Sequence, residues 1–263
     1  MSIPKVIHYC WFGRGEMPER DRKCIESWKK YCPDYEIIQW NEDNYDITKV
    51  QYMKDAYSLG RWGFVPDYAR MDIVYNHGGI YLDTDVELIR PLDSLLSYEA
   101  FMGLEADTNY IALGLGFGAE KGCQLLRELC EYYKTLSFID SGGEPNLTPA
   151  PKITTDYLSQ RINTFDKASA MKKIDNVMIL PPEYLCPMGY LSSKCKITEK
   201  TISIHHYHAS WQTSEEKKAL EEYQKFTRLL GERYGELVYQ FYKAIREEGI
   251  AHAVKKTVGF LRK

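Results

Sequence analysis

The chain has 263 residues, of which 44% are hydrophobic and 27% are charged, values that suit one large globular domain or one domain with a short appendage. The net charge of -3 excludes general nucleic-acid binding through an overall basic field, so a phosphate-rich ligand would need a local cation. No stretch reaches the roughly 18 apolar residues that a membrane span needs.

The number and spacing of the cysteines indicate the redox state of the cellular compartment. The seven cysteines have irregular spacings and form no Cys-x-x-Cys pair. This pattern disfavours a zinc ribbon. We therefore predict reduced, partly buried thiols and a cytoplasmic protein.

The first segment predicts alternating strands and helices. A β-branched and aromatic run at 5–9 predicts a strand, which the Trp11-Phe12-Gly13 loop ends. Residues 19–31 predict a helix with Cys24, Ile25 and Trp28 on one face. A second strand is expected at 35–40. The order strand, helix, strand is typical of an α/β fold.

The next helix leads directly into an acidic tract. Residues 65–77 predict a helix, which the flexible Gly78-Gly79 pair ends. Residues 80–82 predict a short buried strand that runs into Asp83-Thr84-Asp85 and continues through 86–89.

The rest of the chain predicts mixed elements. Further strands are expected at 100–104, 110–117, 177–180 and 201–206, and further helices at 122–133, at 155–162 and from 214 onward with an interruption near 231–235. We predict an α/β domain over 1–213, followed by a helical C-terminal segment over 214–263.

Asp83 and Asp85 are the strongest candidate site residues. In a strand, residues i and i+2 point the same way, so both carboxylates would meet at the carboxyl end of a strand, where α/β sheets bind ligands. Two adjacent carboxylates repel unless a cation neutralises them. A divalent ion with hard oxygen ligands is the natural partner, and a diphosphate would complete its coordination shell. The alternative is a solvated strand end with two surface acids.

Asp67 and Arg70 lie three residues apart on the predicted helix, so they are neighbours on one face. They can pair with each other, or they can bind sugar hydroxyls by charge-assisted hydrogen bonds.

A histidine tract near the C-terminus offers metal ligands. His205, His206 and His208 are half of the six histidines in the chain. On a strand, His206 and His208 would share one face and His205 would point away. Neutral imidazole suits Mn²⁺. Strand geometry does not choose between His205 and His206, and histidines packed at a strand end are the alternative.

The pattern Asp67-x-x-Arg70, an apolar stretch, and Gly78-Gly79-x-Tyr81-x-Asp83-x-Asp85 resembles a known family. It is similar to the sugar transferases with an Asp-x-Asp region, glycosyltransferase family 32. These include yeast-type initiating α-mannosyltransferases and bacterial capsular polysaccharide glycosyltransferases, and the large clostridial glucosylating toxins share the core signature. The similarity covers roughly residues 3 to 211, including the closing Ser210-Trp211.

The resemblance implies a GT-A fold and a metal-dependent, retaining transferase. Such an enzyme moves a hexose from a UDP- or GDP-sugar to a glycan or lipid-linked acceptor, here in bacterial capsular or surface polysaccharide synthesis. It implies Mn²⁺ or Mg²⁺ as cofactor. It also implies roles for single residues. Trp11 would stack on the base, and Asp67 and Arg70 would bind the donor sugar, while Tyr81 and Asp83 would line the sugar and ribose side of the site. Asp85 and a histidine of the C-terminal tract would bind the metal, and Ser210 and Trp211 would contact the diphosphate.

Two other functions remain open. Gly114-x-Gly116-x-x-Ala119 fits one form of the dinucleotide fingerprint, which would indicate an NAD-dependent oxidoreductase. The second open function is a non-catalytic module that binds sugar nucleotides. The intact Asp83 and Asp85 pair argues against it, because such a module need not keep a metal-binding pair.

The C-terminal segment 251–263 carries four basic residues and no acid, and its apolar residues recur at three and four positions. A basic amphipathic helix can lie on an anionic membrane, which would place the protein peripherally at the inner face of the cell membrane. The alternative is a terminal helix that packs on the domain, or a frayed tail.

Overall fold

The computed structural model describes residues 2–160, 171–190, 192, 194–208 and 214–248. The chain forms two units. The first contains Met1–Pro187 and Lys196–Trp211, and the second contains Met188–Cys195 and Gln212–Lys263. Residues 188–195 therefore group with the C-terminal unit, whereas the sequence placed them in the first. The basic segment 251–263 lies outside the described residues.

The first unit is built on a seven-stranded mixed sheet, which confirms the predicted α/β class. The strand order is β2-β1-β3-β6-β5-β8-β7. The strands are β1 Val6–Cys10, β2 Glu36–Trp40, β3 Gly79–Tyr81, β5 Ala100–Leu104, β6 Ile111–Ala119, β7 Lys172–Ile174 and β8 Val177–Leu180. β1 is parallel to β3, and β6 is antiparallel to both β3 and β5. The carboxyl ends of β1, β3 and β5 therefore lie at one edge of the sheet.

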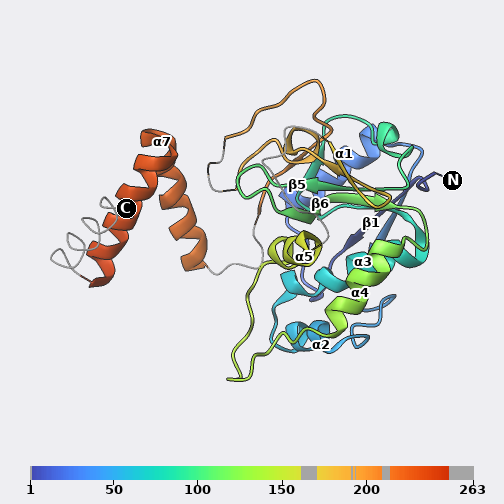
Figure 1. Cartoon of the computed structure of the whole chain (residues 1–263), viewed down its shortest axis with the longest axis horizontal. Coiled ribbons are helices and arrows are strands. Elements are labelled where there is room, and N and C mark those ends of the chain that lie inside the picture. The colour runs from blue at the N-terminus through green and yellow to red at the C-terminus, as the bar shows by residue number, and fades with distance from the viewer. Residues whose placement is uncertain (1, 161–170, 191, 193, 209–213, 249–263) are drawn as a thin grey trace. The chain divides into compact units, whose positions relative to one another are not determined.

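Helices cover both faces of this sheet, and each face has its own apolar core. One core joins the sheet to α2, α3, α4 and α5, of which α3 and α4 lie side by side (Figure 1). The other core joins it to α1, α6 and β4, which pairs with β9 in a small second sheet. These elements are α1 Glu19–Tyr31, α2 Gln51–Ser58, α3 Pro66–His77, α4 Gln124–Lys134, α5 Ala150–Ser159, α6 Pro182–Leu185, β4 Val86–Leu88 and β9 Ser203–His205.

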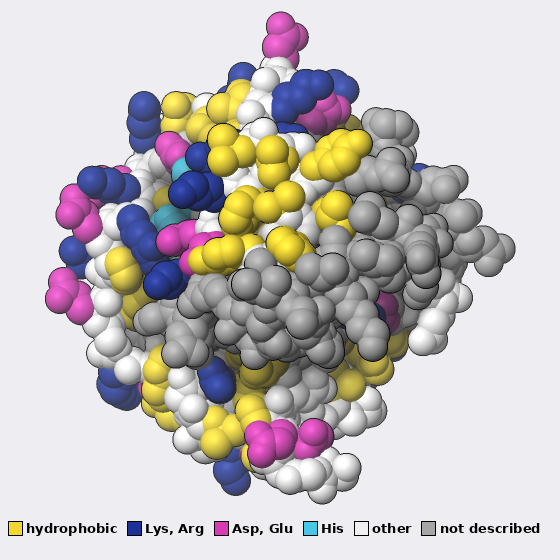
Figure 2. Space-filling view, turned by 90° about the vertical axis from the view of Figure 1, so that its left-hand side faces the viewer, with side chains coloured by type: hydrophobic (Ala, Val, Ile, Leu, Met, Phe, Trp, Pro, Cys, Tyr) yellow, Lys and Arg dark blue, Asp and Glu magenta, His cyan; other side chains and the backbone are white. Residues whose placement is uncertain are grey.

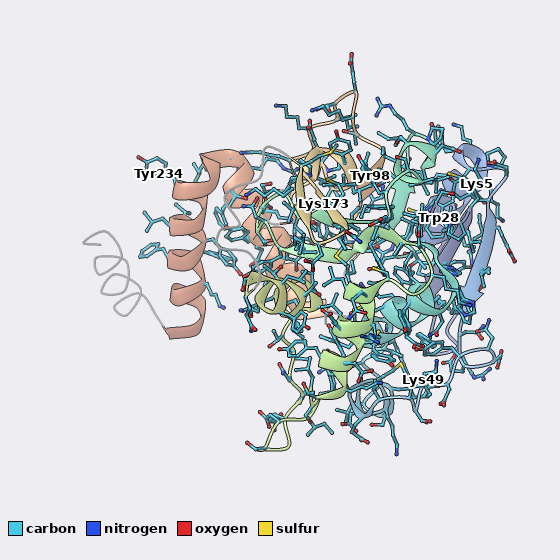
Figure 3. All side chains as sticks on the ribbon, turned by 45° about the vertical axis from the view of Figure 1, so that its right-hand side comes forward. Lys5, Trp28, Lys49, Tyr98, Lys173 and Tyr234 are labelled. Atoms are coloured by element: carbon cyan, nitrogen blue, oxygen red, sulfur yellow. The ribbon has the colours of Figure 1, made fainter. Side chains whose placement is uncertain are left out.

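Helix α1 packs directly on β4. Acidic residues in its first turn and Lys29 and Lys30 in its last turn suit the helix dipole. Trp28 (labelled in Figure 3) is fully buried, and its Nε1 donates to the Val86 carbonyl at 2.7 Å. The Leu88 N–H donates to Ser27 Oγ at 2.9 Å. These contacts fix β4, which follows the Asp83-Thr84-Asp85 tract.

The glycine-rich run 114–119 lies inside β6, a strand of nine buried residues. A dinucleotide fingerprint needs a tight turn from a strand into a helix N-terminus, so the oxidoreductase interpretation is wrong. These glycines serve close packing. A Cβ on Gly118 would lie 2.6 Å from the Phe101 ring, and Gly116 has a φ of 126°.

Other elements differ from the sequence prediction. Helix α5 begins at Ala150 rather than at 155, and α2, α6 and β7 were not predicted. Short elements carry few turns of hydrophobic periodicity, so their pattern is weak.

The second unit contains α7, Ser214–Glu248, in which Gly231 has a non-helical φ of 78°, so the predicted interruption is confirmed. Gln224 Nε2 donates to the Tyr190 carbonyl at 2.7 Å and ties 188–195 to this helix. None of the helices described here is long and apolar enough to cross a bilayer. Figure 2 shows basic and acidic side chains next to one another along the left margin of its face, beside a group of hydrophobic side chains.

The Trp28 hydrogen bond yields a prediction for stability. Trp28→Phe keeps an aromatic ring but leaves the buried Val86 carbonyl without its donor. A buried unsatisfied group costs about 1–3 kcal/mol, so the free energy of unfolding falls by that amount in urea denaturation. Trp62→Phe is the matched control, because Trp62 is 42% exposed, and its change stays within about 0.5 kcal/mol. An equal loss in both variants would show that the buried bond is not the cause.

Candidate active site

The Asp83-Thr84-Asp85 tract forms a turn between β3 and β4. The predicted strand ends at Tyr81, so the strand-face argument for the two carboxylates was wrong. The Val86 N–H donates to the Asp83 carbonyl at 3.1 Å, and the Asp83 N–H donates to the Gly114 carbonyl at 3.2 Å. The turn nevertheless brings the carboxylates together. Candidate ligand atoms of Asp83, Asp85 and His205 all lie within 4.8 Å of one another.

Strand pairing brings His205 to this turn. β9 is antiparallel to β4, with His205 opposite Val86. His205 Nε2 lies 3.1 Å from Asp85 Oδ1, and its Nδ1 is buried without a hydrogen-bond partner among the described residues. Burial alone would lower the pKa of His205, but the Asp85 carboxylate raises it above its usual value.

Asp85 has a complementary environment. Burial alone would raise its pKa, but His205 and the His208 N–H, which donates to Oδ2 at 2.8 Å, hold that pKa well below its usual range. Asp85 is therefore ionised at neutral pH and available as a ligand.

His206 lies away from the cluster, which corrects its prediction as a metal ligand. Its Nε2 is 2.8 Å from Glu87 Oε2. The His206 ring stacks on His208 at 5.7 Å between centroids, so those two share one side as predicted. Of the two histidines that the sequence left open, the geometry favours His205, because pairing with β4 turns it toward Asp85.

Asp67 and Arg70 form a buried pair beside Asp83. Arg70 Nη2 lies 3.1 Å from Asp67 Oδ1 and 3.6 Å from Asp83 Oδ1. The guanidinium thus neutralises carboxylates from both the helix and the turn. Burial raises the pKa of Asp67 to about 7, although Arg70 opposes this shift. Both side chains are buried, and Arg70 joins them to Asp83.

Gly114 makes room for this arrangement, and the sequence analysis missed that role. A Cβ on Gly114 would lie 2.2 Å from Asp83 Oδ2 and 3.1 Å from Arg70 Nη1. Any side chain here would displace the carboxylate. The glycine run itself was the available signal, but it was compared with one form of the dinucleotide fingerprint.

The ring of Tyr81 packs against the guanidinium of Arg70. Only 1% of Tyr81 is exposed, and the Arg70 guanidinium carbon lies 5.3 Å from its ring centroid. This is a cation–π contact. The ring of Tyr81 is covered, as are the side chains of Asp67 and Arg70, so the role of Tyr81 on the sugar side stays a prediction.

Trp11 follows β1 at the same sheet edge as the acidic turn. Its Nε1 donates to the Gly15 carbonyl at 2.7 Å, and the ring is only partly buried. The Gly13 N–H donates to Glu42 Oε1 at 2.6 Å and holds the loop. Ser210 and Trp211 lie outside the described residues.

The donor set fits a divalent cation. Carboxylate oxygens with one imidazole are ligands that Mn²⁺ accepts, and Mg²⁺ prefers the oxygens. Nδ1 of His205, which has no partner within the part of the chain that the structure describes, and the close approach of two carboxylates are features that a cation would resolve. Asp83, Asp85 and His205 are therefore the candidate metal ligands.

Comparison with known proteins finds a family match that includes Asp67, Arg70, Asp83 and Asp85. Residues 18–102 match the family described as "Glycosyltransferase sugar-binding region containing DXD motif". The resemblance predicted from the motifs is confirmed over these residues.

Curated relatives share part of the chain. Inositol phosphoceramide mannosyltransferase 3 of Schizosaccharomyces pombe is 35% identical over 113 residues, which cover 38% of this chain and 29% of that protein. Subversion of eukaryotic traffic protein A of Legionella pneumophila is 26% identical over 166 residues, covering 49% of this chain and 25% of that protein. The chain thus spans less than a third of the length of these relatives.

Solved structures show limited similarity. A glycosyltransferase involved in the glycosylation of the major capsid of PBCV-1 has a TM-score of 0.48 and 14% identity, covering 83% of this chain and 99% of that one.

The two adjacent histidines allow a matched test of metal binding. His205→Gln removes a candidate ligand, whereas His206→Gln removes a ring held by Glu87. We expect Mn²⁺ to raise the unfolding temperature of the wild type and of His206→Gln, because a ligand that binds the native state stabilises that state. In His205→Gln, most of this rise should be lost. Differential scanning fluorimetry with and without Mn²⁺ measures this. A normal Mn²⁺ response of His205→Gln would contradict the ligand assignment.

Proposed function

We propose that this chain, which carries the sugar-binding region of Asp-x-Asp glycosyltransferases, is a metal-dependent enzyme of the GT-A type that moves a hexose from a nucleotide sugar to a hydroxyl group. The observation that carries the proposal is the convergence of Asp83, Asp85 and His205 within 4.8 Å, beside the buried Asp67–Arg70 pair. A cation at this site would hold a diphosphate in a binding module as well, so turnover of a donor decides between the two functions.

The residues of the site have different roles, which follow from their chemistry. Asp83, Asp85 and His205 would hold Mn²⁺ or Mg²⁺, which when bound supplies Lewis-acid stabilisation to a departing diphosphate. Trp11 at the end of β1 offers a ring on which the base of a UDP- or GDP-sugar can stack. The partly buried ring and its fixed loop support this role.

Asp67 and Arg70 act on the donor sugar. Asp67 accepts hydrogen bonds from sugar hydroxyls, and Arg70 donates charge-assisted ones. Because Arg70 also contacts Asp83 at 3.6 Å, it links sugar binding to the metal-binding turn. Retention at the anomeric carbon is part of the proposal and rests on the resemblance alone.

The relatives support a particular acceptor class. Several are named as mannosyltransferases or synthases of inositol phosphoceramides, which are lipids. We infer a mannose-type donor and a glycan or lipid-linked acceptor. A role in bacterial capsular polysaccharide synthesis is a narrower form of this proposal. A cytoplasmic enzyme held peripherally at the inner face of the cell membrane fits such an acceptor, and this location rests on the sequence of 251–263.

Donor hydrolysis without an acceptor tests the function. A panel of UDP- and GDP-hexoses is incubated with protein and Mn²⁺, and release of free sugar is followed. We expect one donor to be hydrolysed. Asp85→Asn keeps the size of the side chain but removes its charge, so turnover falls by about 100-fold or more.

Glu87→Gln is the control, because Glu87 is close in sequence but contacts His206 instead of the cluster. It should keep wild-type turnover. Undiminished hydrolysis by Asp85→Asn, or by the wild type in excess chelator, would refute metal dependence. Binding of a sugar nucleotide with no turnover of any donor would favour the non-catalytic module.

A further inference from the structure

Asp21 is a buried carboxylate that none of the roles above uses. It lies in the first turn of α1 and is 4% exposed. Its Oδ1 accepts a hydrogen bond from Thr84 Oγ1 at 3.2 Å and lies 3.2 Å from His208 Nδ1. Arg20 Nε is 3.7 Å from Oδ2. One oxygen atom therefore contacts two segments that are far apart in the sequence.

Both segments belong to the candidate metal site. Thr84 is the middle residue of the acidic turn, between Asp83 and Asp85. His208 follows β9, and its N–H donates to Asp85 Oδ2 at 2.8 Å. The His206 N–H donates to the Asp85 carbonyl at 3.0 Å. The C-terminal tract is thus attached to Asp85 by its main chain and to Asp21 by the His208 ring.

Helix α1 is a rigid support for this contact. Trp28 and Ser27, further along the same helix, bond to the main chain of β4 at Val86 and Leu88. The helix therefore holds the strand after the turn at one end and the turn itself at Asp21. A side chain anchored on a packed helix fixes its partners more closely than one on a loop.

The buried charge of Asp21 is compensated where it stands. The N-terminus of α1 favours a negative charge in its first turn, and Arg20 Nε lies 3.7 Å from Asp21 Oδ2. What the carboxylate contributes is two oriented acceptor bonds, to Thr84 and to the His208 ring.

We propose that Asp21 is a positioning residue that holds the Asp83-Thr84-Asp85 turn and the His205–His208 tract at the separation that metal binding requires. It acts through Thr84 and His208 and touches neither metal nor donor. The inference rests on the proposed function, since it assigns Asp21 to the same site. Partners of this kind typically change metal affinity by about 10- to 100-fold when removed.

The test measures Mn²⁺ affinity directly in the full chain, by electron paramagnetic resonance of free Mn²⁺. We expect Asp21→Ala to weaken binding by about 10- to 100-fold. Asp21→Asn keeps an acceptor oxygen but not the charge, so it should lose severalfold less than Asp21→Ala. Saturating Mn²⁺ should restore donor hydrolysis in both variants, which a misfolded site would not allow.

Glu19→Ala is the matched control, because it removes the other acid of the first turn of α1, which pairs with Lys23 instead of the acidic turn. It should keep wild-type Mn²⁺ affinity. The proposal is overturned if Asp21→Ala binds Mn²⁺ as the wild type does, or if Glu19→Ala weakens binding equally. Should Asp21→Ala not fold, unchanged affinity in Asp21→Asn overturns it. Failure of the wild type itself to bind Mn²⁺ would instead remove the metal site and the proposed function together.

Discussion

The pairing of β4 with β9 is the interaction on which the candidate site depends. Each strand has only three residues, yet the pairing sets His205 opposite Val86 and so beside Asp85. Short two-stranded sheets are marginal alone, so this one needs the helix that covers it. Trp28 on α1 supplies that support through its bond to Val86. The metal-ligand geometry is thus a consequence of how one helix packs on one short strand.

Charge compensation then decides what the site can bind. Arg70 is shared between Asp67 and Asp83, and His205 pairs with Asp85. A single guanidinium cannot fully neutralise two carboxylates, and burial raises the pKa of Asp67 to about 7. The carboxylates of the cluster therefore lack a full set of positive partners. Asp83, Asp85 and His205 would hold a divalent ion, which would supply positive charge to these carboxylates and to a bound diphosphate.

The sequence predicted the parts of this site that depend on local pattern. The α1 bounds, the Asp83-Thr84-Asp85 tract and the Asp67–Arg70 neighbours follow from helical periodicity and short spacing. It could not choose between His205 and His206, because the choice depends on pairing with a distant strand. Asp21 was missed because its neighbours, Arg20 and Arg22, give the helix start the composition of a solvated face. The role of Gly114 was missed for a similar reason, since a glycine that makes room for Asp83 cannot be told from a loop glycine by spacing.

The central claim is that one divalent ion binds where the acidic turn meets the C-terminal histidine tract. Anomalous X-ray scattering from crystals grown with Mn²⁺ and a nucleoside diphosphate locates that ion directly. The account predicts one strong anomalous peak in contact with Asp83, Asp85 and His205. A peak at His206 and Glu87 instead, or no peak at the turn while the nucleotide is bound, would contradict it.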